Sequence, residues 1–219
     1  MVTIRMYNVG LGDCFLLRFK APAPNRDRFM LIDCGLILGS VAGEATLRAV
    51  AEDIFDTTGG RLDVVVATHE HQDHLSGFWY AQDIFKKIKI DKVCMAWTER
   101  PGDEMARRLK DKIEDFSFRL DGVVSKLEDD TLKNPQKFNL RAQSSLKSVR
   151  SVLDFLGLDT DDSIPKNGSG NPHNEDEQTP KKKVSMNRKA LDYLQKEAVR
   201  PENIVYHEPD TTTTLDHTH

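Results

Sequence analysis

Residues Leu62–Gly77 read LDVVVATHEHQDHLSG, and this stretch decides the fold expected for the chain. Its first part, from Leu62 to Ala67, is apolar around a single charge and predicts a short buried strand. Four side chains able to bind a metal follow within six positions; they are His69, His71, Asp73 and His74. A strand that ends in such a cluster predicts a metal site at its carboxyl end.

The spacing of these four residues suggests how they would be divided between two metal ions. Residues two apart in an extended segment point the same way, so we expect His69 and His71 to approach one ion together. A tight turn would bring Asp73 and His74 back toward a second ion. Imidazole and carboxylate suit zinc, and also iron or manganese. The zincin motif HExxH is absent, because Asp73 stands where its second His would be. The alternative is a histidine-rich surface turn.

The run His69-Glu70-His71-Gln72-Asp73-His74 resembles the HxHxDH signature of the metallo-β-lactamase-fold hydrolases. The resemblance implies a metal-dependent hydrolase that holds one or two zinc ions and uses a metal-activated hydroxide. Asp73 would then be the catalytic residue, because it would both ligate the metal and orient the hydroxide.

Two further turns extend the resemblance. The turn Val9-Gly10-Leu11-Gly12-Asp13 resembles the subgroup related to the soluble domain of bacterial DNA-uptake competence channels, which implies phosphodiester substrates, nucleic acid included. In that subgroup Asp13 would lie near the metal site. Asp33, in Asp33-Cys34-Gly35, would support the metal loop by hydrogen bonding and not by ligation. The alternative for Asp33 is a turn residue that ends a strand.

The composition restricts the protein class. A chain of 219 residues fits one domain with an insertion, and its net charge of −4 argues against a globally basic nucleic-acid binder. Three cysteines, odd in number and widely spaced, match neither a disulfide framework nor a zinc ribbon, so we expect buried thiols in a reducing compartment. No apolar run approaches the length of a membrane span, and no signal peptide is visible, so we expect no membrane segment and a cytoplasmic location.

The first hundred residues alternate strands and helices. The expected strands cover residues 2–8, 14–19, 29–33, 62–67 and 88–97, with helices over 43–57 and 77–88. The first strand alternates Val2, Ile4 and Met6 with polar residues, as a half-buried strand does. The expected fold is therefore α/β (α+β), with residues 1–100 as the first half of the αββα sandwich that the resemblance implies.

The remainder departs from that fold. Residues 101–158 predict a helical insertion with two helices. One starts at Pro101-Gly102-Asp103 and has Met105, Leu109, Ile113 and Phe116 at helical spacing, and the other covers residues 140–156. Residues 159–184 predict a flexible polar linker, and residues 185–219 a helix, a strand over 203–207 and a polar tail. No second set of strands carries the remaining ligands, so the sandwich is expected to be incomplete in its second half. His207, which follows a strand, is the additional ligand considered; Asp210, Asp216, His217 and His219, near the terminus, are further candidates.

Three functions follow from this sequence. The first is a metal-dependent hydrolase acting on a small-molecule or phosphodiester substrate, with nucleic acid possible. The second is a metallo-β-lactamase-fold binding module without catalytic competence. The third is a thioesterase of the glyoxalase kind, which has the same loop and a different pocket.

Overall fold

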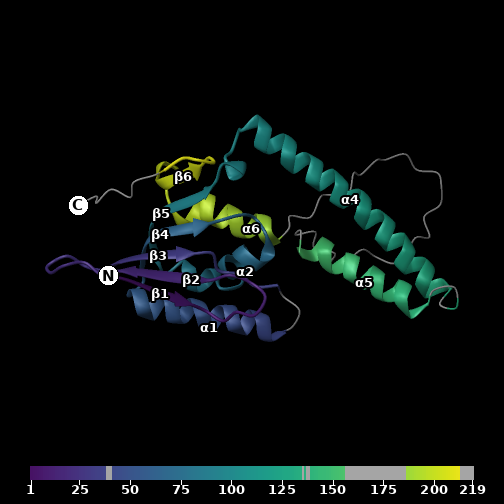
Figure 1. Cartoon of the computed structure of the whole chain (residues 1–219), viewed down its shortest axis with the longest axis horizontal. Coiled ribbons are helices and arrows are strands. Elements are labelled where there is room, and N and C mark those ends of the chain that lie inside the picture. The colour runs from purple at the N-terminus through teal and green to yellow at the C-terminus, as the bar shows by residue number, and fades with distance from the viewer. Residues whose placement is uncertain (38–40, 135, 137–138, 156–185, 213–219) are drawn as a thin grey trace.

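The computed structural model describes residues 1–37, 41–134, 136, 139–155 and 186–212 (Figure 1). Its strands form one mixed sheet in the order β1-β2-β3-β4-β5-β6. The strands are β1 (Val2–Met6), β2 (Phe15–Phe19), β3 (Arg28–Ile32), β4 (Arg61–Ala67), β5 (Lys89–Ala96) and β6 (Ile204–His207).

Among the described residues there are six α-helices and three shorter turns of helix. The α-helices are α1 (Val41–Thr58), α2 (Gln72–Tyr80), α3 (Gln82–Phe85), α4 (Glu104–Lys133), α5 (Leu140–Phe155) and α6 (Met186–Tyr193). The shorter ones are the 3₁₀ turns η1 (Trp97–Glu99) and η4 (Pro201–Asn203) and the π-helical turn η3 (Leu194–Ala198).

The strand directions bring the ends of β4, β5 and β6 to one edge of the sheet. Strands β1 to β3 are antiparallel, as a hairpin followed by a third strand requires, and β3 to β6 are parallel. The carboxyl ends of parallel strands are where open α/β sheets place their sites, and β4 ends there in the histidine-rich stretch.

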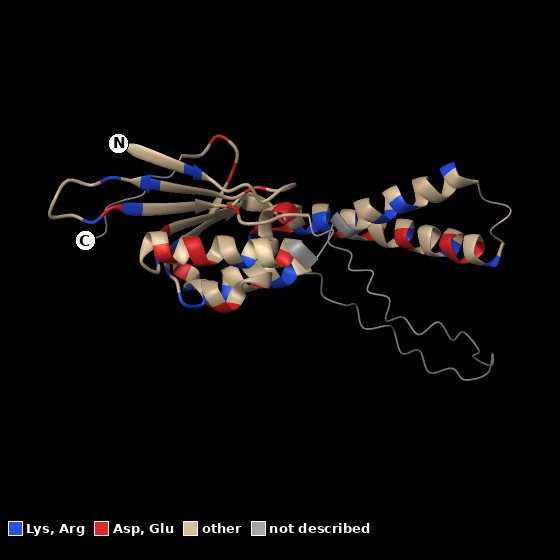
Figure 2. Ribbon diagram, turned by 90° about the horizontal axis from the view of Figure 1, so that it is seen from below, with Lys and Arg blue, Asp and Glu red and all other residues tan. Residues whose placement is uncertain are grey.

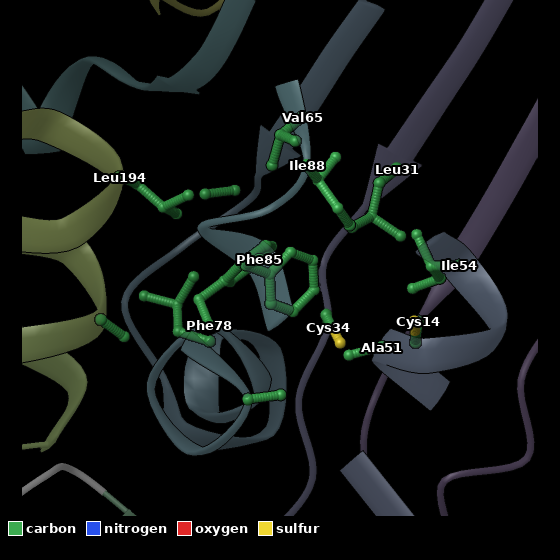
Figure 3. Close-up of a cluster of buried hydrophobic side chains, with 14 of the residues drawn as sticks. Cys14, Leu31, Cys34, Ala51, Ile54, Val65, Phe78, Phe85, Ile88 and Leu194 are labelled. Carbon is green, nitrogen blue, oxygen red and sulfur yellow. The ribbon is translucent and has the colours of Figure 1, made fainter. Parts of the chain in front are cut away.

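The helices pack on one face of this sheet (Figure 2). A row of paired residues across the strands, Leu16, Leu31, Val65 and Val93, is buried on that face. Figure 3 shows Leu31 and Val65 in one cluster with Ile54 of α1, Phe78 of α2 and Leu194 of η3. Burial of each such large apolar side chain stabilises the fold by about 1.5–3 kcal/mol.

The opposite face of the sheet is apolar and, over its first strand, uncovered. Ile4 and Met6 are 65% and 71% exposed, so the expectation of a half-buried first strand was wrong for these side chains. The residues that face the helices are instead Arg5 and Tyr7, whose side chains both hydrogen bond Asp53 of α1. The alternation was correct, but its apolar residues face away from the helices.

Two long helices form a hairpin that projects from this body (Figure 1). Asp103 caps α4 by accepting a hydrogen bond from the Ala106 amide. Helix α4 runs for 30 residues and continues past Phe116, the last of the residues noted at helical spacing. Arg150 of α5 joins the two helices through ion pairs with Asp121 and Glu128 of α4. Residues 101–158 were expected to be helical, and 104–133 and 140–155 are.

Two other expectations differ from the structure or lie outside it. The helix expected over 77–88 begins at Gln72, inside the metal-ligand stretch, and breaks at Ala81 into α2 and α3. The expected linker 159–184 lies outside the described residues, as do residues 213–219 of the expected tail. The described residues contain one mixed sheet with helices and no second sheet facing it, so they show the α/β (α+β) class and not the expected sandwich.

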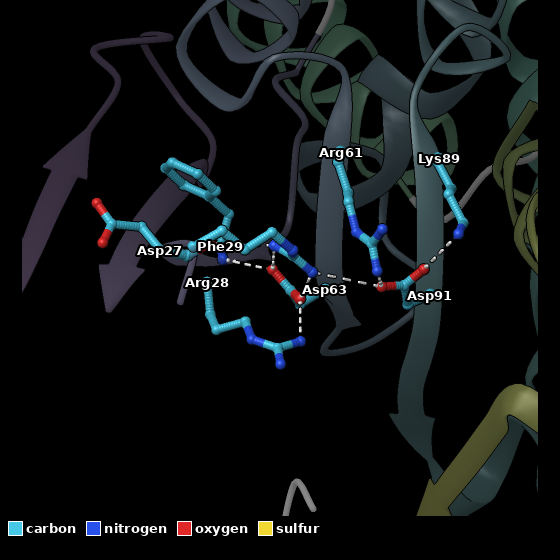
Figure 4. Close-up of polar contacts among 8 residues, drawn as sticks. Asp27, Arg28, Phe29, Arg61, Asp63, Lys89 and Asp91 are labelled. Atoms are coloured by element: carbon cyan, nitrogen blue, oxygen red, sulfur yellow. Dashed lines mark hydrogen bonds and ion pairs between the residues drawn. The ribbon is translucent and has the colours of Figure 1, made fainter. Parts of the chain in front are cut away.

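The amino-terminal ends of the central strands carry a polar network (Figure 4). Asp63 of β4 accepts hydrogen bonds from Arg26, from Arg28 at 2.9 Å and from the Phe29 amide at 2.8 Å. Next to it, Asp91 of β5 pairs with Arg61. This network lies at the end of the sheet opposite the histidines and joins the loop before β3 to β4.

The cysteines and the helices agree with two expectations from the composition. Cys14, Cys34 and Cys94 are free and buried, as expected. The pKa of the Cys14 thiol is raised by its hydrogen bond with Cys34 and by burial. Of the helices that the structure describes, none has the length and apolar character needed to cross a membrane.

Candidate metal centre

The site begins where β4 ends. Thr68 to His71 form an irregular loop, and α2 starts at Gln72, with His71 as its extended N-cap residue. Asp73 therefore lies in the first turn of α2, where the helix dipole favours a negative charge. The start of a helix, and not a separate tight turn, brings Asp73 and His74 back beside the histidines.

Three of the four expected ligands converge. His69, His71 and Asp73 are half-buried and offer ligand atoms that all lie within 4.8 Å of one another. Ligands around a tetrahedral zinc ion lie about 3.5 Å apart, as follows from zinc–ligand bonds of about 2.0–2.2 Å. Small side-chain rotations therefore suffice to close the three groups around one ion. The ring centroids of His69 and His71 are 4.5 Å apart.

The fourth expected ligand, His74, lies against this group and is held by a buried carboxylate. Its Nδ1 lies 2.8 Å from Oδ2 of Asp33, and its Nε2 lies 3.3 Å from Oδ2 of Asp73. Because a carboxylate only accepts, the contact with Asp33 requires a proton on Nδ1 of His74. Asp33 thus supports the loop by hydrogen bonding and lies outside the three-residue cluster.

Thr68 extends this support to His69. Its amide donates to Oδ1 of Asp33 at 2.9 Å, and its hydroxyl donates to Oδ2 at 2.7 Å. With that hydroxyl proton committed to Asp33, the contact of 3.0 Å between Thr68 Oγ1 and His69 Nδ1 requires the proton to lie on Nδ1. Nε2 of His69 is then free to act as a ligand. No sequence pattern predicted these contacts of Thr68.

One buried oxygen in the cluster has no partner among the described atoms. Oδ1 of Asp73 is buried and accepts no hydrogen bond. Buried carboxylate oxygens without a donor are rare in folded proteins because desolvation is costly. A cation bound between His69, His71 and Asp73 would satisfy this oxygen, so the residues fit a metal.

Burial and neighbouring charge both favour neutral imidazole at His69. The pKa of His69 is lowered, first by burial and then by repulsion from His74 and His71. Asp33 and Asp73 act in the opposite sense and do not reverse the shift. A neutral imidazole is the form that ligates a metal.

Two glycines allow three loops to meet under the site. The Asp13 amide donates to the carbonyl of Asp73 at 3.0 Å, and the Gly35 amide donates to the carbonyl of Asp13 at 3.1 Å. A Cβ on Gly35 would lie 2.5 Å from backbone atoms of Asp73 and His74, and one on Gly12 would meet the carbonyl of Gly35. The turn that contains Asp13 and the turn after Asp33 therefore pack directly against the segment that carries Asp73 and His74. The Asp13 carboxylate lies 3.7 Å from Nδ1 of His74.

A second set of charges ties the loop to the helical hairpin. Lys110 of α4 bonds Glu70, the residue between His69 and His71, at 3.0 Å, and it also pairs with Glu99. Glu99 is 6% exposed, and its pKa is raised first by burial and then by the charge of Glu70, with Lys110 opposing both. Lys110 and Glu99 also line a cavity of about 280 Å³ beside η1. No sequence pattern links these three positions, so the sequence reading missed them.

The more distant candidate ligand does not join the cluster. His207 ends β6 and pairs with Ala96 of β5, which places it two strands away from β4. Asp210 lies beyond β6, while Asp216, His217 and His219 lie outside the described residues. Within the described part of the chain, the group that could hold a metal is His69, His71 and Asp73.

No family model matches this sequence, and no curated protein matches it.

Proposed function

We propose that the chain is a metal-dependent hydrolase, with zinc the expected ion and iron or manganese as alternatives. The observation that carries the proposal is the buried, unpartnered Oδ1 of Asp73 beside His69 and His71. When bound, zinc supplies a Lewis acid and lowers the pKa of water to about 7, which makes a nucleophile available at neutral pH.

The residues of the chain have distinct parts in this proposal. His69, His71 and Asp73 would hold the ion, and His74, with its proton on Nδ1, would offer Nε2 to a second ion. Asp33 would keep His74 in the tautomer that its role requires, with Thr68 doing the same for His69. The carboxylate of Asp73, in the first turn of α2, would also orient the attacking water. Phosphodiester substrates, nucleic acid included, belong to the proposal through the resemblance of the HxHxDH and Gly-Asp turns.

The same proposal includes a finer fold. We propose that the sheet is one layer of a metallo-β-lactamase-type sandwich. The second layer would pack on the face opposite the helices, where Ile4 and Met6 of β1 are exposed. Support comes from the apolar residues of that face, where Ile4, Leu17 and Met30 are paired across three neighbouring strands. A row of apolar residues on the open face of a sheet is expected only where a further apolar layer packs against that face.

A second candidate function rests on the position of His207. Because that residue lies two strands from the cluster, one loop supplies all the ligands that the described residues bring together. A site of three ligands from one loop is suited to weak metal binding in a module that recognises a partner without turnover.

Metal content and turnover distinguish the two functions. The purified chain would be stripped with a chelator, reloaded with Zn²⁺ and analysed by mass spectrometry for bound metal. Hydrolysis of bis(p-nitrophenyl) phosphate and of a single-stranded oligodeoxynucleotide would be followed in parallel. The hydrolase predicts tightly held zinc and turnover that His71→Ala abolishes, while His207→Ala, outside the cluster, retains both. Weak, easily chelated zinc without turnover supports the binding module, and absence of any bound metal after reloading contradicts both.

A further inference from the structure

Helix α4 carries an apolar stripe on a side that α5 leaves open. Its members are separated alternately by four and three residues: Leu109, Ile113, Phe116, Leu120, Val123 and Leu127. Ile113 and Phe116 are 56% and 63% exposed, and Val123 is 55% exposed. This spacing is the 3.5-residue repeat of helices that pack along each other. Exposed apolar side chains in such a row mark an interaction surface.

The neighbouring helix does not account for the stripe. Helix α5 packs on the adjacent side of α4, where Arg150 pairs with Asp121 and Glu128; Val124, between them in the sequence, is 2% exposed. The stripe instead continues onto α5 as an apolar groove of about 250 Å³. The groove is lined by Leu127, Ala142, Ser145, Leu146 and Val149. The stripe and the groove therefore form one continuous apolar surface on the hairpin. The hairpin projects from the body of the protein, where a partner can reach it (Figure 2).

A row of cations runs along one edge of this stripe. It consists of Lys112, Arg119, Lys126 and Lys133, each seven residues from the next. Asp115 pairs with Arg119, and Asp129 pairs with Lys133, in each case from a position one turn earlier and further from the stripe. The edge beside the stripe is therefore basic, and the acidic residues that pair with it lie further from the stripe.

We propose that this surface binds an amphipathic α-helix of a partner protein, with apolar side chains at the same 3.5-residue repeat and Asp or Glu along the edge that meets the cations. The apolar repeat supplies the contact area, and the charges set the choice and orientation of the partner. This mode is the laying of an amphipathic helix into an apolar groove.

Charge decides against a second copy of the same helix. In an antiparallel pair the cationic row of one α4 would face the cationic row of the other, and like charges repel. In a parallel pair the row would face Ser117 and Val124, which carry no acid to pair with it. A partner with an acidic edge meets neither obstacle.

Two synthetic peptides test the proposal against the whole chain. Both have 28 residues with Leu at the a and d positions of four heptads; one carries Glu at e and g, and the other carries Lys. Fluorescence anisotropy should show the Glu peptide binding about tenfold or more tighter than the Lys peptide, with the difference shrinking at high salt. Equal binding of the two peptides, or binding of neither, would overturn the proposal.

Matched variants locate the surface. Val123→Asp, in the centre of the stripe, should abolish binding of the Glu peptide. Phe118→Asp is the control, because Phe118 is 71% exposed on a different side of the same helix and should leave binding unchanged. Circular dichroism would confirm that both variants keep their helix content. The pair Lys112→Glu and Lys126→Glu should reverse the preference toward the Lys peptide.

Two other occupants would contradict the proposal. A homodimer seen by analytical ultracentrifugation, and broken by Val123→Asp, would assign the surface to a second copy. Binding to phosphatidylglycerol vesicles, without binding of the Glu peptide, would assign it to a membrane surface.

Discussion

His74 donates from Nδ1 to a carboxylate that is almost wholly buried, Oδ2 of Asp33, at 2.8 Å. Asp33 takes a left-handed backbone conformation, with φ of 54°, at the point where β3 ends and the chain turns under the metal loop. The Asp33 carboxylate also accepts hydrogen bonds from the amide and the hydroxyl of Thr68. The Asp33 side chain therefore fixes both the residue that follows β4 and the orientation of His74.

Asp33→Asn should weaken metal binding while leaving the fold intact. Asn tolerates the left-handed conformation, so the backbone need not change. The amide cannot accept all three hydrogen bonds as the carboxylate does, and residues that orient metal ligands contribute about 10–100-fold to metal affinity. Calorimetric titration with Zn²⁺ would measure the change, with His207→Ala as the control. An unchanged affinity would show that Asp33 only ends a strand.

Gly35→Ala should destabilise the protein and displace the metal loop. The added Cβ would lie 2.5 Å from backbone atoms of Asp73 and His74, and backbone cannot move aside as a flexible side chain can. We expect a loss of about 1–3 kcal/mol, as for other overpacked sites. Gly122→Ala is the matched control, since no atom lies within 4 Å of its Cβ in α4, and it should stabilise by up to about 1 kcal/mol. Urea unfolding of the two variants measures both effects, and an equal response in both would contradict this account.

The sequence predicted the parts of the site that lie close together in the chain. The histidine cluster could be recognised because its members follow one buried strand within six positions, and Asp13 and Asp33, far from it in the chain, only through the family resemblance. Lys110 could not, because its approach to Glu70 depends on the path of η1 and on where α4 starts. The end of α4 was not predicted, although its apolar repeat continues beyond Phe116 through Leu120, Val123 and Leu127.

Because of Asp63, the free energy of unfolding of the protein should decrease at acid pH. Burial alone would raise the pKa of Asp63, but hydrogen bonds from Arg26, the Phe29 amide and Arg28 bring it below its ordinary value. A carboxyl with a lowered folded-state pKa stabilises the fold above its unfolded pKa of about 3.9, and this contribution is lost as pH falls through the folded value. The stability difference between the wild type and Asp63→Asn should therefore be full at pH 6 and shrink below about pH 4. Urea unfolding across this range measures it; a difference that stays constant down to pH 2 would contradict the ion pairing.

Lys110→Met should destabilise the protein through the charge that it leaves behind. Glu99, with its side chain 3% exposed, would lose its cation while Glu70 remains nearby. An unsatisfied buried group costs about 1–3 kcal/mol, and more when it is charged. Adding Glu99→Gln to Lys110→Met should recover part of the loss, because the buried charge is then gone. Thermal unfolding of the single and double variants measures the recovery, and purely additive losses would show that Lys110 acts by packing alone.

The two faces of the sheet should respond differently to the loss of an apolar side chain. Leu31 is fully buried under the helices, so Leu31→Ala should cost about 2–5 kcal/mol through lost burial and a cavity. Ile4, on the opposite face, is 65% exposed, so Ile4→Ser in the same chain should change stability by less than about 0.5 kcal/mol. Denaturant unfolding of both variants gives the comparison. A cost for Ile4→Ser close to that of Leu31→Ala would mean that the face is already covered in solution, and size-exclusion chromatography with light scattering would then show whether another molecule covers it.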